Sequence, residues 1–300
     1  MVNNYAELVQ AALDRALPMP QEGVNATVGE IPSLLSEAMR YSLLQGGKRL
    51  RPAMLLAATQ MLGGDLDEAM PYACAIEMIH CYSLIHDDLP GMDDDELRRG
   101  KPTNHMVYGI GQAILAGDGL LSLAMETMQQ AALAHPDHIL AHTHAAAEVM
   151  RGAGVRGMVA GQSLDLLLEH KPTSKVSDLS FIQENKTAAL FIYALRAAGR
   201  LCSADNQVMS ALENYGRAFG MLFQTVDDLL DEQGDEVILG KRVGKDRESG
   251  KLTAVSLYGS GGAAALKPTF LNNALEALSS FGTEADYFRE LIETAATRKA

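Results

Sequence analysis

The chain has 300 residues, 47% of them hydrophobic, which predicts a globular protein with a large core and excludes a disordered chain. The formal net charge of −13 at pH 7 excludes a general affinity for nucleic acid or for an anionic membrane. We therefore expect neither as a partner, and any anion site must be local.

The composition favours helices in a single domain. Aromatic residues make up only 5% of the chain and Trp is absent, which favours helix packing over an aromatic-rich sheet. No linker divides the sequence, so we expect one domain over residues 1–300. The three cysteines form no CxxC pair, and residues 1–10 lack the apolar core of a signal peptide. Reduced thiols in a cytoplasmic protein are the expectation, with no disulfide framework and no cysteine-based zinc site.

Helices are expected in succession along the chain, because apolar residues recur at three- and four-residue spacing. Three long helical segments are predicted over 69–89, 177–199 and 205–231, and residues 259–265 are predicted to form a loose turn. Breaks are expected at Gly46-Gly47, Gly63-Gly64, Pro90-Gly91, Pro102, Pro136, Pro172 and Gly234. The prediction is an all-α fold, a single large helical bundle whose core opens into a deep central cavity.

The first charged segment is basic. GGKRLRP, at 46–52, carries Lys48, Arg49 and Arg51 in a chain that is acidic overall. Arginine offers a planar fork to phosphate oxygens and lysine offers a mobile point charge, so the mixture suits diphosphates better than a single carboxylate. Ordinary solubilising charge is the alternative explanation for any one of these residues.

An acidic cluster follows at the end of the next long helical segment. In IHDDLPGMDDDELRRGK, Asp87 and Asp88 end the apolar segment, Pro90-Gly91 break it, and Asp93 begins a second acidic run. Carboxylates at a helix C-terminus face the negative end of the helix dipole and repel one another, so the arrangement needs cations. Oxygen ligands of this kind suit Mg²⁺. Arg98 and Arg99 come directly afterwards, in place to hold phosphate beside a metal.

A second acidic cluster, FQTVDDLLDEQGDE, also ends an apolar helical segment. Asp227 and Asp231 are four residues apart and share a helical face, whereas Asp228 points elsewhere. Mg²⁺ takes one or two protein carboxylates and completes its shell with water and phosphate. Either cluster alone is more often a solvated surface, but the pair predicts a clamp for a pyrophosphate group.

Two further basic segments are less decisive. Lys186 and Thr187 lie in a mostly apolar helical segment, where a lone lysine more often extends to the surface. GKRVGKDRESGK, at 240–251, places Lys241 and several other cations after the second acidic cluster. We interpret both segments as candidates for holding anions.

Taken together, these segments resemble the trans-polyprenyl diphosphate synthase family, and most closely its bacterial farnesyl diphosphate synthases. The likeness covers about two thirds of the chain. It is carried, in the family's order, by GGKRLRP (46–52), EMIHCYSLIHDDLPGMDDDELRRGKPTNH (77–105), AGDGLL (116–121), GQSLDL (161–166), NKTAALF (185–191), FGMLFQTVDDLLD (219–231) and LGKRVGKDRESGKLT (239–253). Ala188 departs from the family's usual KTG, and Ala254-Val255 departs from its usual residues after Thr253.

The resemblance implies an isoprenoid synthase fold, isoprenoid diphosphate substrates, three Mg²⁺ per active site and a homodimer. It implies a role for each of the following residues: metal binding for Asp87, Asp88, Asp93, Asp227 and Asp231; departure of the allylic diphosphate for Arg98, Lys186 and Lys241; isopentenyl diphosphate binding for Lys48, Arg49, Arg51, His80 and Arg99; proximity to the carbocation for Thr187 and Gln224; and the metal-bound network for Gln162. Lys251 and Arg298 resemble its basic residues near the C-terminal end, where a lid role is a hypothesis.

The helical segment before Asp87 carries the residues that are predicted to limit the length of the product. Ser83 lies one turn before Asp87 on the same face, with Tyr82 beside it, so both are predicted to floor the cavity. An aromatic residue five places before the first Asp resembles the bacterial farnesyl synthases. Tyr82 as an ordinary core residue remains open, and so does a geranylgeranyl product.

Two other classes are weighed against a catalytic synthase. A noncatalytic subunit of a heteromeric synthase typically loses one aspartate motif, whereas both are whole here. A terpene cyclase typically has a different second motif and lacks the isopentenyl site, so DDLLD together with GGKRLRP opposes it. The chain also has no nucleophile elbow or glycine-rich phosphate loop, and an ionisation mechanism needs neither.

Overall fold

The structure, a computed structural model, describes residues 5–19, 30–169, 171, 175–233 and 249–298. It confirms the all-α prediction: within these residues the only strands are β1 (Leu97–Arg98) and β2 (Lys101–Pro102), which form one short antiparallel hairpin. The expectation of one domain over 1–300 stays a prediction.

The α-helices of the first half are α1 (Tyr5–Ala16), α2 (Ser33–Leu43), α3 (Leu50–Met61), α4 (Leu66–Asp87), α5 (Asn104–Tyr108), α6 (Ile110–Ala134) and α7 (Ile139–Ala153). Those of the second half are α8 (Met158–Leu168), α9 (Val176–Ile182), α10 (Ala189–Leu201), α11 (Asn206–Gln233), α14 (Ala254–Ala277) and α15 (Asp286–Thr297). Short 3₁₀ turns, η1 (Pro136–His138) and η3 (Thr283–Ala285), precede α7 and α15, and a π-helical segment, η2 (Gln183–Ala188), joins α9 to α10.

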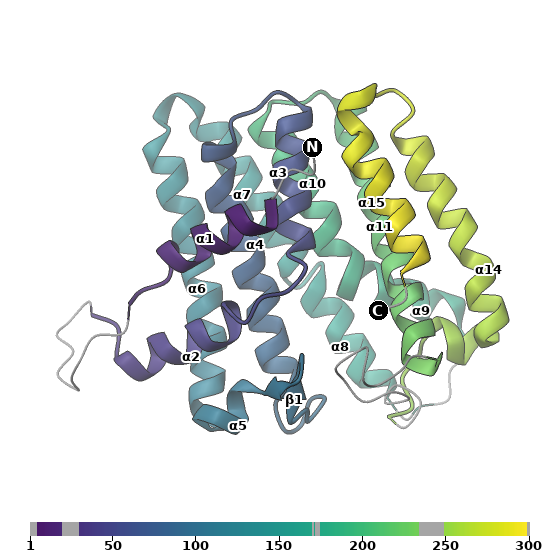
Figure 1. The fold of residues 1–300 in the computed structure, drawn as a ribbon, viewed down its shortest axis with the longest axis horizontal. Coiled ribbons are helices and arrows are strands. Elements are labelled where there is room, and N and C mark those ends of the chain that lie inside the picture. Colours follow the sequence, from purple (N-terminus) through teal and green to yellow (C-terminus); the bar gives the residue numbers. More distant parts are fainter. Residues whose placement is uncertain (1–4, 20–29, 170, 172–174, 234–248, 299–300) are drawn as a thin grey trace.

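Helix α4 runs through the middle of the bundle between α3 and α6, while α11 packs between α10 and α14 (Figure 1). Most of α4 is buried on every side, as expected of a helix that is apolar all round. The C-terminal end of α4 lies beside the β1–β2 hairpin at the lower edge of the view (Figure 1). The core thus holds rigidly the helix whose end carries the first acidic cluster.

The long helical segment predicted over 177–199 is helical throughout, but η2 interrupts its α-helical hydrogen bonding. A Cβ on Gly161 of α8 would lie 2.2 Å from the backbone nitrogen of Lys186, and one on Gly220 of α11 would lie 2.4 Å from Ala188. Glycine at both positions therefore lets two helix backbones approach η2 closely. π-Helical turns are frequent at functional sites, and this one carries Lys186 and Thr187.

The loose turn predicted over 259–265 is wrong. Gly259, with φ 69°, makes a single kink, and α14 continues helically on both sides of it. One glycine at positive φ is enough to bend the chain, and the alanines that follow favour helix. No described helix combines the length and apolarity needed to cross a membrane.

Candidate active site

A cavity of about 920 Å³ lies among α4, α8, η2 and α11. Both acidic clusters reach it, because Asp87 from the end of α4 and Asp227 from α11 line its wall. It is also lined by these predicted site residues: Arg51, His80, Tyr82, Ser83, Arg98, Arg99, Gln162, Lys186, Thr187 and Gln224. Residues far apart in the sequence thus meet around one cavity.

The loop after α4 folds back over the helix end. The backbone N–H of Asp93 donates to the carbonyl of Asp87 (2.8 Å), and that of Asp95 donates to the carbonyl of Asp88 (3.1 Å). Gly91 at φ 92° permits the turn. These bonds satisfy the last carbonyls of α4 and gather the acidic side chains of two segments around one helix end.

The hairpin that follows aims two arginines at this region. Arg99 and Gly100, both at positive φ, form its two-residue turn. Arg98 pairs with Asp88 through two guanidinium nitrogens, at 2.6 to 3.0 Å, and Arg99 donates to the carbonyl of Gly46. Gly47 leaves room for this contact, since a Cβ there would lie 2.8 Å from the Arg99 guanidinium.

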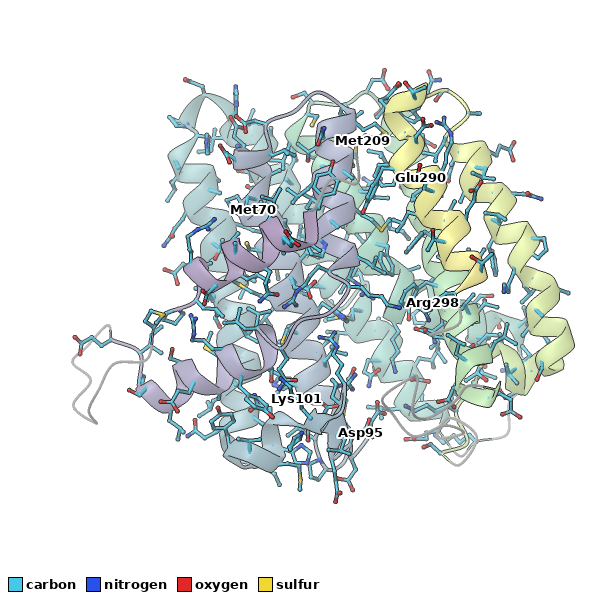
Figure 2. The ribbon with its side chains drawn as sticks, viewed as in Figure 1. Met70, Asp95, Lys101, Met209, Glu290 and Arg298 are labelled. Carbon is cyan, nitrogen blue, oxygen red and sulfur yellow. The ribbon has the colours of Figure 1, made fainter. Side chains whose placement is uncertain are left out.

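Protein cations contact both acidic clusters. Lys251 lies 2.7 Å from Asp93. Arg298, which follows the end of α15 (Figure 2), pairs with Asp227. Each cation sits on a carboxylate that the sequence predicts as a metal ligand. A metal ion at either carboxylate would therefore take the place of an ion pair within the chain.

In the second acidic cluster, Asp227 lines the cavity, whereas Asp228 and Asp231 do not. Asp228 is buried and accepts hydrogen bonds from Gln224 (2.8 Å) and from the backbone N–H of Ala254 (2.8 Å), so it anchors the start of α14. Asp231 is also buried. Its metal role, like those of Asp88 and Asp93, stays a prediction.

The π-helical segment presents two polar side chains to the cavity. Lys186 pairs with Asp165 of α8 at 2.6 Å, a partner that the sequence reasoning missed although it lies within GQSLDL. The Thr187 hydroxyl donates to Gln224 (2.5 Å), which in turn donates to Asp228. These bonds fix the direction of both side chains.

The residues that are predicted to bind isopentenyl diphosphate separate into two groups. Arg51, His80 and Arg99 line the cavity, and Arg51 stacks on Phe191 with its guanidinium carbon 4.2 Å from the ring centre. Burial, followed by the charge of Arg51, lowers the pKa of His80 well below its usual range, so His80 is neutral at pH 7.

The other group lies outside that wall. Arg49 is buried and pairs with Glu77 at 2.5 Å, while it also donates to Gln10 and to the carbonyl of Leu43. Lys48 is exposed at the surface and does not line the cavity. Lys241 lies outside the described residues. The substrate roles of all three stay predictions.

Three buried polar atoms at the cavity have no hydrogen-bond partner among the described residues. They are both amide atoms of Gln162 and Nε of Arg51. Buried polar atoms are rarely left unpaired, so these atoms fit a polar ligand. Carboxylates of Asp87 and Asp227 on the same wall supply the hard oxygen donors that suit Mg²⁺ bound with a phosphorylated compound.

Comparison with known proteins agrees with this geometry. A profile described as polyprenyl synthetase matches residues 32–292. A farnesyl diphosphate synthase from Haemophilus influenzae is 43% identical over 295 residues, which cover 97% of each chain. The chain belongs to the polyprenyl synthetase family. It is therefore a prenyltransferase of isoprenoid biosynthesis, in a family that uses Mg²⁺.

Other polyprenyl synthetases resemble the chain equally well. Geranylgeranyl pyrophosphate synthase 9 of Arabidopsis thaliana, a chloroplastic protein, is 44% identical over 280 residues, which cover 92% of this chain and 74% of that one. The solved apo structure of an FPP/GFPP synthase from Zymomonas mobilis matches with a TM-score of 0.83 and 33% identity, covering 98% of this chain and 96% of that one. The relatives are thus divided between farnesyl and geranylgeranyl products.

The ionisation of Asp87 gives the site an expected pH dependence. Burial raises the pKa of Asp87 to about 6, and a protonated carboxyl is a poor metal ligand. We expect divalent ion affinity to fall about tenfold between pH 7.5 and pH 5, because one proton then competes with the metal. Mn²⁺ titration followed by electron paramagnetic resonance measures this change.

The same pKa carries a consequence for stability. Because the pKa of Asp87 in the folded protein lies above its ordinary value of 3.8, the protonated carboxyl favours folding, and this contribution is lost as the pH rises through about 6.

The control for the metal-binding prediction is Asp87→Asn, which cannot ionise and should bind Mn²⁺ more weakly with a flatter pH profile. A parent affinity that stays constant between pH 7.5 and pH 5 would contradict the assignment of Asp87.

Proposed function

We propose that this prenyltransferase condenses isopentenyl diphosphate with dimethylallyl or geranyl diphosphate to give farnesyl diphosphate, and that it depends on Mg²⁺. The observation that carries the proposal is the position of Asp87 and Asp227 on one cavity together with Arg51, Arg98 and Lys186. Two carboxylates and three cations on one wall suit a substrate that is a metal-bound diphosphate.

Mg²⁺ would be held by the two acidic clusters, and three ions per site are expected. Its proposed protein ligands are Asp87, Asp88, Asp93, Asp227 and Asp231. When bound, it supplies positive charge that stabilises the departing diphosphate. Arg98 and Lys186 add fixed positive charge on the same wall, so the negative charge that develops on the leaving group meets groups already in place.

The rest of the cavity suits an allylic cation. Met158, Leu190 and Phe223 line the cavity with apolar groups, and an apolar lining would protect such a cation from water. The hydroxyl of Thr187 donates a hydrogen bond to the amide of Gln224. Both side chains place oxygen atoms at the cavity without adding charge. Arg51 and Arg99 lie on the same cavity for the second diphosphate, and the released pyrophosphate is the proposed acceptor of the final proton.

The direct test is incubation with labelled isopentenyl diphosphate, Mg²⁺ and each allylic primer, followed by measurement of pyrophosphate release and product length. Farnesyl diphosphate as the main product is the expected result. A twenty-carbon product would favour the geranylgeranyl alternative that several relatives suggest. Intact Mg²⁺ binding without turnover would instead favour a noncatalytic subunit of a heteromeric synthase.

Chain length is proposed to depend on Tyr82. Tyr82 and Ser83 line the cavity one helical turn before Asp87, and the Tyr82 ring packs edge-on against His86 with 5.7 Å between ring centres. Tyr82→Ala removes this ring, so we expect products longer than those of the parent. Product analysis by chromatography measures the shift, and Tyr82→Phe, which keeps the ring, is the control. Unchanged length in Tyr82→Ala would reject Tyr82 as the floor.

A homodimer is also proposed. The family resemblance suggests it, and α5 and α6 expose several large apolar side chains, among them Met106, Ile110, Ile114 and Leu115. A heterodimeric geranylgeranyl pyrophosphate synthase large subunit of Arabidopsis thaliana is 42% identical to this chain, so a different partner is the alternative. Light scattering that gave the mass of one chain at micromolar concentration would contradict the homodimer.

A further inference from the structure

A group of metal-binding side chains lies outside the cavity. Four of the eight histidines fall between residues 135 and 144. Two of them, His138 just before α7 and His142 one turn into it, meet Glu68 from the first turn of α4. The geometry points to a zinc site, and we propose that Glu68, His138 and His142 bind one Zn²⁺ per chain.

The distances fit a single ion. Oε2 of Glu68 lies 3.4 Å from Nδ1 of His138 and 3.2 Å from Nε2 of His142, and all three ligand atoms lie within 4.8 Å of one another. Ligands about 2.0 to 2.1 Å from a tetrahedral zinc ion are roughly 3.3 Å apart. A small movement of His138, whose side chain is exposed, would therefore complete a three-residue site.

The donor atoms select the metal. Two imidazole nitrogens and one carboxylate oxygen suit Zn²⁺, whereas Mg²⁺ prefers oxygen alone. Three protein ligands leave a fourth position for water. The site therefore differs in chemistry from the two acidic clusters and should not compete with them for Mg²⁺.

The surroundings of His142 already resemble the outer shell of a metal site. His142 is fully buried, and its Nδ1 lies 3.1 Å from the hydroxyl of Tyr72, which also lies 3.0 Å from the backbone carbonyl of His142. The Tyr72 hydroxyl can therefore donate a hydrogen bond to that carbonyl while it accepts one from the Nδ1–H of His142. This arrangement leaves the lone pair of Nε2 directed at the metal, as a hydrogen-bonded outer partner typically does.

When no metal is bound, the Nε2–H of His142 can donate a hydrogen bond to Oε2 of Glu68. The carboxylate of Glu68 is an oxygen ligand of the kind that Zn²⁺ accepts beside histidine nitrogens. When Zn²⁺ binds, the neutral imidazole of His142 would carry its one proton on Nδ1, beside the Tyr72 hydroxyl, and would bind the metal through Nε2.

The site is remote from the catalytic cavity. Glu68 and Asp87 lie near opposite ends of α4, about 29 Å apart at the rise of an α-helix. Met70, close to Glu68 on α4, lies well above Asp95 of the first acidic cluster (Figure 2). Zn²⁺ would link the start of α4 to the connection between α6 and α7, and we expect it to stabilise the bundle without entering the active site.

The test uses metal-stripped, full-length protein dialysed against Zn²⁺ with excess Mg²⁺ present. We expect one bound Zn²⁺ per chain by elemental analysis, and a rise in Tm at saturating Zn²⁺. His138→Ala should weaken binding by about tenfold or more and abolish the rise in Tm. Its exposed side chain makes it safe for folding, which circular dichroism checks.

Two controls locate the ion. His144→Ala removes an exposed histidine from the same helix and should leave binding unchanged, and so should Asp87→Ala at the acidic cluster. Co²⁺ should give a tetrahedral ligand-field absorption in the parent and in His144→Ala, but not in His138→Ala or Glu68→Gln. Parent-like Zn²⁺ binding by His138→Ala and Glu68→Gln would overturn the proposal, as would the absence of Zn²⁺ binding by the parent.

Discussion

Replacement of Asp87 by alanine is expected to lower kcat by at least about a hundredfold, the scale on which loss of one preorganised electrostatic group slows a reaction. Asp87 ends α4 and lines the cavity beside Arg98 and Lys186. If Asp87 binds the metal as proposed, its loss removes a metal ligand and therefore positive charge at the leaving group. Pyrophosphate release at saturating substrates and Mg²⁺ measures the effect.

The fold should survive this change. The Asp87 side chain is partly exposed to the cavity and burial already disfavours its charge, so circular dichroism and the denaturation midpoint should match those of the parent. Asp94→Ala is the matched control, because it removes an exposed acid from the same loop that does not line the cavity. Near-parental kcat in Asp87→Ala would overturn the metal assignment.

Glu77→Ala is expected to reduce the free energy of unfolding by about 3 to 5 kcal/mol. Glu77 and Arg49 form an ion pair at 2.5 Å whose side chains are only 5% and 3% exposed. Removal of the carboxylate leaves the Arg49 guanidinium buried without its counter-charge, and the hydrogen bonds to Gln10 and to the carbonyl of Leu43 only partly compensate. Urea denaturation measures the loss.

An exposed pair provides the comparison. Asp14, whose side chain is 60% exposed, pairs with Arg40, and Asp14→Ala should change the free energy of unfolding by less than about 1 kcal/mol. Glu77→Gln keeps a hydrogen-bond acceptor for Arg49. Its loss in the free energy of unfolding should lie between those of Glu77→Ala and Asp14→Ala. A loss below about 1 kcal/mol in Glu77→Ala would show that the buried pair contributes little to stability.

The catalytic cavity could be predicted where its residues follow local rules. The acidic clusters at the ends of two apolar helical segments are visible in the sequence. The helical period also predicts that the adjacent residues Asp227 and Asp228 point in different directions. Two long helices, α4 and α11, lie close to their predicted ranges. These features depend on hydrophobic periodicity and on residues near one another in the chain.

Features that depend on distant residues could not be predicted. GGKRLRP predicts anion binding for Arg49, but the segment could not show that the buried Arg49 side chain pairs with Glu77, 28 residues further along the chain. Asp165 and Lys186 meet because Gly161 allows α8 to approach the π-helical segment. The hairpin that directs Arg98 and Arg99 is only two residues per strand, too short for an alternating pattern.

The proposed zinc site shows a second limit of the sequence reasoning, which considered metal binding by cysteine and by carboxylate only. The spacing of His138 and His142, one helical turn apart, was a local signal for nitrogen ligands. Glu68 could not have been added from the sequence, because α6 separates it from them and only the packing of α4 beside the start of α7 brings it near.

The proposed function requires that Asp87 and Asp227 hold divalent ions around one diphosphate. A crystal structure with Mn²⁺ and an unreactive thiolodiphosphate analogue of dimethylallyl diphosphate, with the ions located by anomalous scattering, tests it most directly. We expect ions bound to both carboxylates and to the same diphosphate, with Lys251 and Arg298 displaced from Asp93 and Asp227. Ions at one cluster alone, or a diphosphate bound outside this cavity, would contradict the account.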